Sequence, residues 1–266
     1  FEYVRKDLGL PASQVWISTS GGAQQTNYSY GLHPDYGPQY GANTVDGDGI
    51  FNAEFKSILA QWGKPKLLPT AEQALLAKMR AAIGAGEGAR LNSPESAAQI
   101  EKYILEELTS GTSDIRGVNA ADAKALRVAR NLLVIFKPTL VSIVLQQADV
   151  AHGSYNGYVD VIRRNDEALG DLWRAVKADP ELRESTALFV CPEFGRDSDL
   201  NSRRGLDHGD GSEDLEFVSA VAWGPDFARA RIVEDDVHAI DLCPTICSML
   251  GADAAKARGK ALPRLF

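Results

Sequence analysis

Histidine and carboxylate side chains occur together at three places in the chain, each just beyond a predicted strand or at the start of a predicted helix. These places hold Asp149 and His152, Asp207 and His208, and His238. Three of the four histidines of the chain fall there. A mixed set of imidazole and carboxylate groups is typical of sites for zinc or another divalent ion. The pattern therefore predicts a metal site at the edge of a sheet where the strands end, which is where open α/β folds carry their chemistry.

Residues 186–209 are expected to contribute one half of that site. They begin with a short apolar run, Ala187–Cys191, which predicts a buried strand because turn-forming residues lie on both sides of it. The chain then enters a polar loop that ends in Asp207 and His208. Glu193 lies where the strand ends, and it could replace Asp207 as a metal ligand or supplement it. The sequence leaves both alternatives open.

Arg196, in the same polar loop, is a candidate substrate ligand. Its planar guanidinium group could hold a non-bridging oxygen of an anionic ester through parallel hydrogen bonds. The alternative is an ion pair with Asp197 or Asp199, which lie next to it in the sequence. The sequence is compatible with both interpretations.

The second half of the chain alternates between strand and helix patterns. Strands are predicted over 139–145, 187–191 and 217–223, and helices over 158–178 and 239–250. This order predicts parallel strands joined by right-handed crossovers, with helices on both faces of the sheet. We therefore expect an α/β fold with a mostly parallel sheet.

The first half of the chain contributes one predicted strand, a long loop and a helical region. A short helix at the start is followed by a strand over 14–19 and by a loop rich in Gly, Tyr and Asn up to residue 49. Residues 51–136 have mainly helical patterns, and we expect them to form a helical cap or insertion within a single domain over 1–266. No capping residue precedes Phe1, which predicts that the N-terminal part of this domain lies upstream.

Composition and charge narrow the classes of partner. The net charge of −8 argues against nucleic acid or an anionic membrane surface as a partner. No apolar run approaches the roughly 18 residues of a membrane span. Three cysteines do not form a disulfide framework. We expect a bacterial periplasmic or secreted protein, with any export signal upstream of Phe1; the oligomeric state is not indicated.

The order of these motifs resembles the alkaline phosphatase superfamily, which includes sulfatases, nucleotide pyrophosphatase/phosphodiesterases and phosphate-transferring mutases. The shared order is Asp-x-x-His, a strand leading to Asp-His-Gly, and His-x-x-Asp-Leu-x-Pro-Thr-Ile ahead of Leu-Gly. It covers residues 137–251. The sequence PEFGRD followed by GLDHG further resembles the sulfatase-like and phosphodiesterase-like branch.

The resemblance implies an alkaline phosphatase-like fold and a two-metal site. Carried over residue by residue, Asp149, His152 and His238 match the ligands of one ion, and Asp207 and His208 match two ligands of the second. Such ions would clamp the attacking and leaving oxygens of an ester. The implied activity is hydrolysis of a small anionic phosphate or sulfate ester. Zinc is the expected ion, with manganese, magnesium or calcium as alternatives.

The chain also departs from the superfamily pattern. A further Asp and a Ser, Thr or modified Cys nucleophile would precede the region that resembles the family, so no nucleophile is assigned. Ser18, Thr19 and Ser20 follow a strand that the pattern places after the nucleophile. The Asp-x-x-His spacing is one residue shorter than the usual phosphodiesterase form. Two further hypotheses therefore stay open: a catalytically silent metal-binding or ligand-binding domain that retains the fold, and a structural domain whose histidines are incidental.

Overall fold

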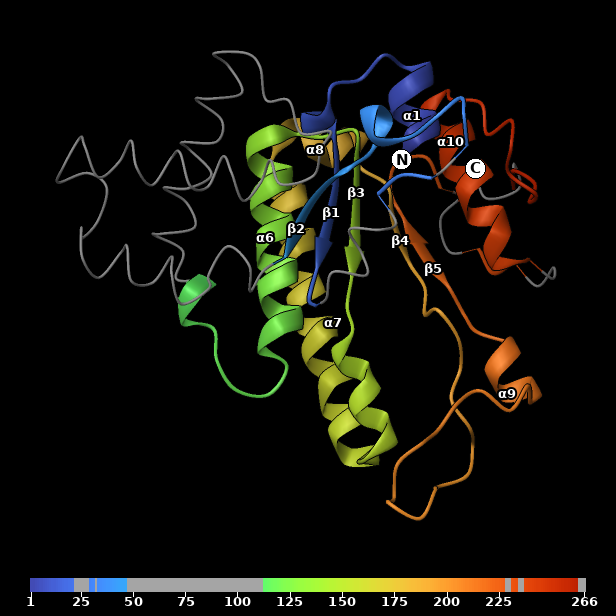
Figure 1. Ribbon diagram of the computed structural model, residues 1–266. Helices are drawn as coiled ribbons and strands as arrows, with labels where there is room; N and C mark the ends of the chain where they lie inside the picture. Colours follow the sequence, from blue (N-terminus) through green and yellow to red (C-terminus); the bar gives the residue numbers. More distant parts are fainter. Residues whose placement is uncertain (22–28, 32, 47–111, 228–230, 234–236, 263–266) are drawn as a thin grey trace, which may run out of the picture. The chain divides into compact units, whose positions relative to one another are not determined.

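The computed structural model describes residues 1–21, 29–31, 33–46, 112–227, 231–233 and 237–262 (Figure 1). These residues belong to two compact units, each described here by itself. The first unit comprises Phe1–Leu145 and Glu234–Arg264, and the second comprises Gln146–Val233 and the last two residues. Most of the predicted helical insertion over 51–136 lies outside the described residues. Among the described residues, no helix is both long enough and apolar enough to cross a membrane.

The first unit contains a three-stranded parallel sheet in the order β2-β1-β3. The strands are β1 (Val15–Thr19), β2 (Asn43–Asp46) and β3 (Leu140–Val144). All five residues of β1 are buried, as expected for a central parallel strand whose faces are both covered. The predicted strands over 14–19 and 139–145 are thereby confirmed.

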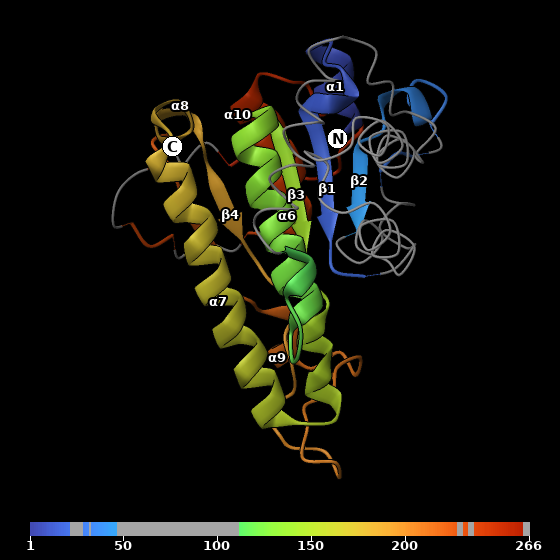
Figure 2. The same cartoon turned by 90° about the vertical axis from the view of Figure 1, so that its left-hand side faces the viewer.

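Helix α6 (Ala120–Phe136) packs against β1 and β3, and Figure 2 shows it alongside both strands. The ring of Trp16 packs on Phe136 with centroids 5.1 Å apart. The Ser18 hydroxyl donates a 2.8 Å hydrogen bond to the carbonyl oxygen of Ala125. Because Trp16 and Ser18 are two residues apart in a strand, their side chains point to the same face of the sheet. The Ser18 hydroxyl therefore serves to join the strand to the helix.

The alternate residues of β1 contact two further helices, α1 (Glu2–Asp7) and α10 (Leu242–Leu250). Val15 and Ile17 form an apolar cluster with Val4 of α1 and Cys247 of α10. α1 and α10 contact each other, and they lie side by side in Figure 1. The short 3-10 helix η7 (Ala239–Asp241) precedes α10. The predicted helices at the start of the chain and over 239–250 are thus confirmed.

The second unit is dominated by helix α7 (Tyr155–Ala178). The helix begins where the Ser154 hydroxyl accepts the N–H of Gly157 at 3.0 Å, which satisfies one of the free donors of the first turn. Its shorter neighbours are η6 (Gln147–His152) before it and α8 (Pro180–Ser185) after it. The prediction of a long helix over 158–178 is confirmed, with a start three residues earlier.

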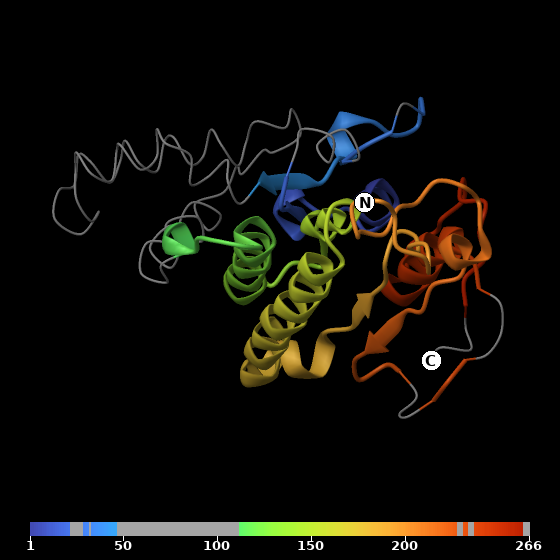
Figure 3. The ribbon, with the colours of Figure 1, turned by 90° about the horizontal axis from the view of Figure 1, so that it is seen from below.

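The second unit also holds a two-stranded sheet of β4 (Leu188–Val190) and β5 (Val221–Trp223), seen in Figure 3. The pair is antiparallel, so the prediction that these strands run parallel is wrong. A parallel neighbour needs a crossover connection, usually a helix. The chain between β4 and β5 contains only the four-residue helix α9 (Glu213–Glu216) among irregular segments, and it returns to β4 in the opposite direction.

The segment between β1 and residue 49 was predicted to be a loop, but it contains β2 and a 3-10 helix, η3 (Pro38–Tyr40). The sequence Asn-Thr-Val-Asp of β2 has no apolar alternation. Its strand conformation comes from pairing with the buried strand β1, in which Ile17 lies opposite Thr44. The backbone hydrogen bonds of β2 come from a partner strand. The residues of β2 alone therefore do not predict a strand.

Candidate metal centre

Asp149 and His152 lie on the same face of η6 because η6 is a 3-10 helix. Such a helix has about three residues per turn, so the side chains of residues i and i+3 are aligned. Oδ1 of Asp149 is 3.2 Å from Nε2 of His152. The Asp-x-x-His spacing, one residue shorter than the usual phosphodiesterase form, therefore matches the helix type on which it is carried.

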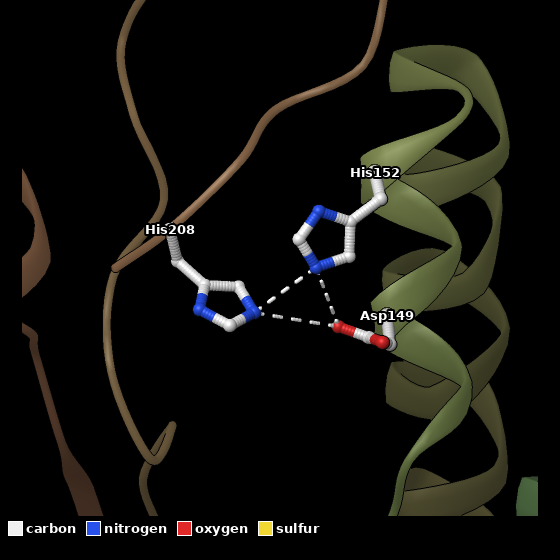
Figure 4. Close-up of side chains that lie close together, drawn as sticks. All are labelled: Asp149, His152 and His208. Carbon is white, nitrogen blue, oxygen red and sulfur yellow. Dashed lines mark hydrogen bonds and ion pairs between the residues drawn. The ribbon is translucent and has the colours of Figure 1, made fainter. Parts of the chain in front are cut away.

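His208 brings a third ligand atom to the same point, as Figure 4 shows. Its Nε2 is 3.0 Å from Nε2 of His152 and 3.7 Å from Oδ1 of Asp149. Bonds of about 2.0–2.1 Å in tetrahedral geometry place two zinc ligand atoms about 3.3 Å apart. The three observed separations lie around this value. Asp149, His152 and His208 thus form a set that could hold one ion, with a coordination position left for water or substrate.

Asn201 holds the loop that carries His208 against η6. Its side-chain amide donates to the carbonyl oxygen of His152 at 3.1 Å. Its side-chain oxygen accepts the N–H groups of Arg203 and Gly205, both at 2.9 Å. One side chain therefore shapes the turn over 201–205 and joins it to the backbone of a candidate ligand.

Gly205 allows this loop to approach η6 closely. A Cβ atom on Gly205 would lie 2.2 Å from the carbonyl oxygen of Ala151 and 2.6 Å from that of His152. The next residue, Leu206, is buried and donates its N–H to the carbonyl oxygen of Ala151 at 2.8 Å. Backbone contacts thus fix the loop and η6 together, independently of the side chains that would hold an ion.

Asp207 lies on the far side of the His152 ring from the three converging atoms. Its Oδ1 is 2.7 Å from Nδ1 of His152, and Nη2 of Arg203 donates to the same oxygen at 3.3 Å. The hydrogen bond with His152, followed by one from Asn201, lowers the pKa of the Asp207 carboxyl group. Asp207 was predicted to be a metal ligand, but it is not a member of the three-residue set.

Arg196 occupies the side of the site where the ligand atoms converge. Its Nη2 donates to Oδ1 of Asp149 at 2.8 Å, and its Nη1 is 3.3 Å from Nε2 of His152. The side chain is only 10% exposed. Its ion pair is therefore with Asp149 and not with either neighbouring residue, Asp197 or Asp199. The hydrogen bond from Arg196 is the main cause that lowers the pKa of the Asp149 carboxyl group.

Two other predicted ligands are not members of this set. Glu193 is exposed and is not among the three converging residues. His238 belongs to the first unit, where it is exposed at the N-terminus of η7 and its backbone N–H donates to Oδ2 of Asp241. The buried Asp241 carboxylate also accepts the N–H of Lys260, and these bonds lower its pKa. Asp241 thus has a structural role within the His-x-x-Asp-Leu-x-Pro-Thr-Ile motif.

The arrangement suits a cation that polarises an oxygen atom, because two imidazole nitrogens and one carboxylate oxygen converge beside an open position. The sequence signals found all three residues, since each is a histidine or carboxylate next to a predicted element. They did not indicate Asn201 or Arg203, which are ordinary polar loop residues by type. Comparisons with protein-family models, curated proteins and solved structures found no match.

Gly205→Ala is expected to destabilise the docked loop, because the added Cβ would overlap backbone atoms of η6. We expect the free energy of unfolding in urea to fall by about 1–3 kcal/mol. Gly153→Ala is the matched control. Its Cβ would meet nothing closer than 3.9 Å, so its unfolding free energy should change little. An equal loss in the two variants would contradict the docking of the loop.

Arg196→Gln is expected to raise the pKa of Asp149, because the hydrogen bond that favours the ionised carboxylate is lost. In the unchanged protein, the lowered pKa contributes stability above the ordinary Asp pKa of about 3.9, and this stability is lost as pH falls through the folded pKa. Carboxyl ¹³C chemical shifts followed against pH measure the change. Arg203→Gln, which removes a guanidinium that contacts Asp207, should leave the titration of Asp149 nearly unchanged.

Proposed function

We propose that this protein is a metal-dependent hydrolase of phosphate or sulfate esters, and that it is a member of the alkaline phosphatase superfamily. The observation that supports the proposal is the convergence of Asp149, His152 and His208 on one point, with separations suited to a single ion. The Arg196 guanidinium beside them supplies a group that recognises an oxyanion. The parallel order β2-β1-β3 in the first unit agrees with the mostly parallel sheet that such a fold would have.

Zinc is the ion that we propose, because two imidazole nitrogens suit a borderline cation better than magnesium or calcium, which prefer all-oxygen sites. Manganese, magnesium and calcium are the alternatives, and all three favour carboxylate and other oxygen ligands over imidazole. When bound, the ion would supply a Lewis acid that neutralises charge on an ester oxygen. The ligands Asp149 and His152 would come from η6, and His208 from the loop docked on it.

Arg196 is proposed to change partners when the ion is present. Its guanidinium now contacts both Oδ1 of Asp149 and Nε2 of His152, which are two of the three ligand atoms. Two cations cannot share these atoms without strong repulsion. An ion at this point would therefore release Arg196 from Asp149. Its planar fork would then be available to bind two oxygens of a phosphate or sulfate group.

Removal of a ligand tests the metal site. We expect Asp149→Ala, His152→Ala and His208→Ala each to lower zinc affinity, measured by competition with a chromophoric chelator. The loss should exceed the roughly 10- to 100-fold that is typical when a residue that orients a ligand, without contacting the ion, is replaced. His33→Ala is the control, because His33 is an exposed loop histidine of the first unit. Unchanged affinity in all three variants would reject the site. The prediction that His238 is a ligand stays a prediction, and His238→Ala tests it in the same assay.

Turnover of nitrophenyl phosphate and nitrophenyl sulfate by the zinc-loaded protein separates the proposed hydrolase from the alternative. Hydrolysis of either ester that is lost in His152→Ala supports the proposal. Zinc binding without hydrolysis, also in a chain extended upstream of Phe1, would favour a catalytically silent metal-binding domain. Absence of zinc binding in the unchanged protein would exclude both.

Arg196→Gln is expected to bind zinc more tightly than the unchanged protein, because it removes a cation that competes for Asp149 and His152. An ion pair of roughly 1 kcal/mol corresponds to about a fivefold gain in affinity. The same variant should lose ester turnover at low substrate concentration, because the oxyanion loses the paired N–H donors of the guanidinium group. Arg204→Gln, which removes an exposed charge from the same region, is the control. Weaker zinc binding in Arg196→Gln would contradict the proposal that Arg196 changes partners when the ion binds.

A further inference from the structure

The Asp207–His152 contact assigns different roles to the two nitrogens of one imidazole ring. Nε2 of His152 faces Asp149 and His208, whereas Nδ1 is 2.7 Å from Oδ1 of Asp207. A histidine commonly binds an ion through one nitrogen and donates a hydrogen bond from the other, which orients the ring. Asp207 occupies the position of the group that accepts such a bond.

The shortest contact of the ring, with Asp207, favours one tautomer. Oδ1 of Asp149 lies 3.2 Å from Nε2, but that oxygen accepts the shorter, 2.8 Å hydrogen bond of Arg196. An ionised carboxylate only accepts hydrogen bonds, so Nδ1 of His152 must carry the hydrogen that it donates to Asp207. The guanidinium of Arg196 only donates, and its Nη1 is 3.3 Å from Nε2 of His152. Nε2 is therefore the acceptor nitrogen, and its lone pair faces Arg196. This is the form of the ring that can bind a cation through Nε2.

Asp207 is itself held in place by the loop around it. Nη2 of Arg203 donates to the same Oδ1 atom at 3.3 Å. The nearby Asn201 side chain, after His152, helps to lower the pKa of the Asp207 carboxyl group. The backbone carbonyl oxygen of Asp207 accepts the N–H of Asp197 at 3.1 Å. Asn201 donates to the carbonyl oxygen of His152 and accepts the N–H groups of Arg203 and Gly205 in the turn before Asp207. One residue therefore links His152 to the segment that carries Asp207.

We propose that Asp207 is a positioning residue and not a metal ligand: it holds His152 in the Nδ1–H tautomer with Nε2 directed at the ion, and Asn201 holds Asp207 and His152 in register. This inference rests on the proposed function, because it assigns a role at the same site. It differs from the sequence prediction, in which Asp207 and His208 together held a second ion.

The tautomer can be measured without any metal. Two-bond ¹H–¹⁵N correlation spectra at about pH 8, where imidazole is mostly neutral, give the tautomer of each of the four histidines. We expect His152 to be in the Nδ1–H form in the unchanged protein. Asp207→Ala should shift it toward a mixture with the Nε2–H form. The same tautomer in both proteins, in a variant whose urea midpoint shows that it is folded, would overturn the proposal.

Zinc affinity separates a positioning residue from a ligand. We expect Asp207→Asn to weaken zinc binding by about 10- to 100-fold, and by less than His208→Ala in the same titration. Asp199→Asn, an exposed carboxylate of the same loop, should leave the affinity unchanged. A loss in Asp207→Asn as large as in His208→Ala would show that Asp207 is a ligand. No loss would show that Asp207 has no role in zinc binding.

Asn201 provides a second test through the same contact. Asn201→Asp keeps the oxygen that accepts the N–H groups of Arg203 and Gly205 but removes the amide that donates to His152. We expect a His152 tautomer mixture and weaker zinc binding in this variant as well. If the unchanged protein binds no zinc, the proposed function fails, while the tautomer spectra still decide whether Asp207 orients His152.

Discussion

The contact on which the candidate metal centre depends is the docking of residues 201–207 against η6. The N–H of Leu206 bonds to the carbonyl oxygen of Ala151, and Gly205 lies where any side chain would overlap the η6 backbone. His152 and His208 are 56 residues apart in the sequence. Exposed ion pairs contribute little by themselves, so the side chains alone would not hold this arrangement. The backbone contact is therefore what brings the three candidate ligand atoms together.

Two ion pairs, one on each side of the His152 ring, balance the charges of the cluster. Asp149 pairs with Arg196 on the Nε2 side, and Asp207 pairs with Arg203 on the Nδ1 side. The two guanidinium groups therefore have different environments. Arg196 is largely buried and lies on the ligand atoms, whereas the Arg203 side chain is mostly exposed and lies behind the ring. Under the proposed function, a cation on the Nε2 side would change the partners of Arg196 and leave the pair of Arg203 and Asp207 intact.

The sequence predicted the elements that are defined by their own side chains. The apolar run of β1 and the amphipathic pattern of α7 were found at nearly their observed bounds. The sequence could not predict β2 or the antiparallel direction of β5, because both depend on a partner strand. At the site, residue type identified Asp149, His152 and His208. It could not show which ring nitrogen faces which group, so it did not indicate the contact between Asp207 and Nδ1 of His152.

The 3-10 pitch of η6 limits the spacing that Asp149 and His152 can have. Its tight 3-10 turn aligns Asp149 with His152, whereas an α-helix aligns residues that are three or four apart. Inserting one residue between the two would turn their side chains away from each other unless the segment also relaxed into an α-helix. Because an α-helix aligns both spacings, a change of helix type would have to precede or accompany the added residue. As long as η6 keeps its 3-10 turn, a change in the length of this motif would therefore separate the two candidate ligands.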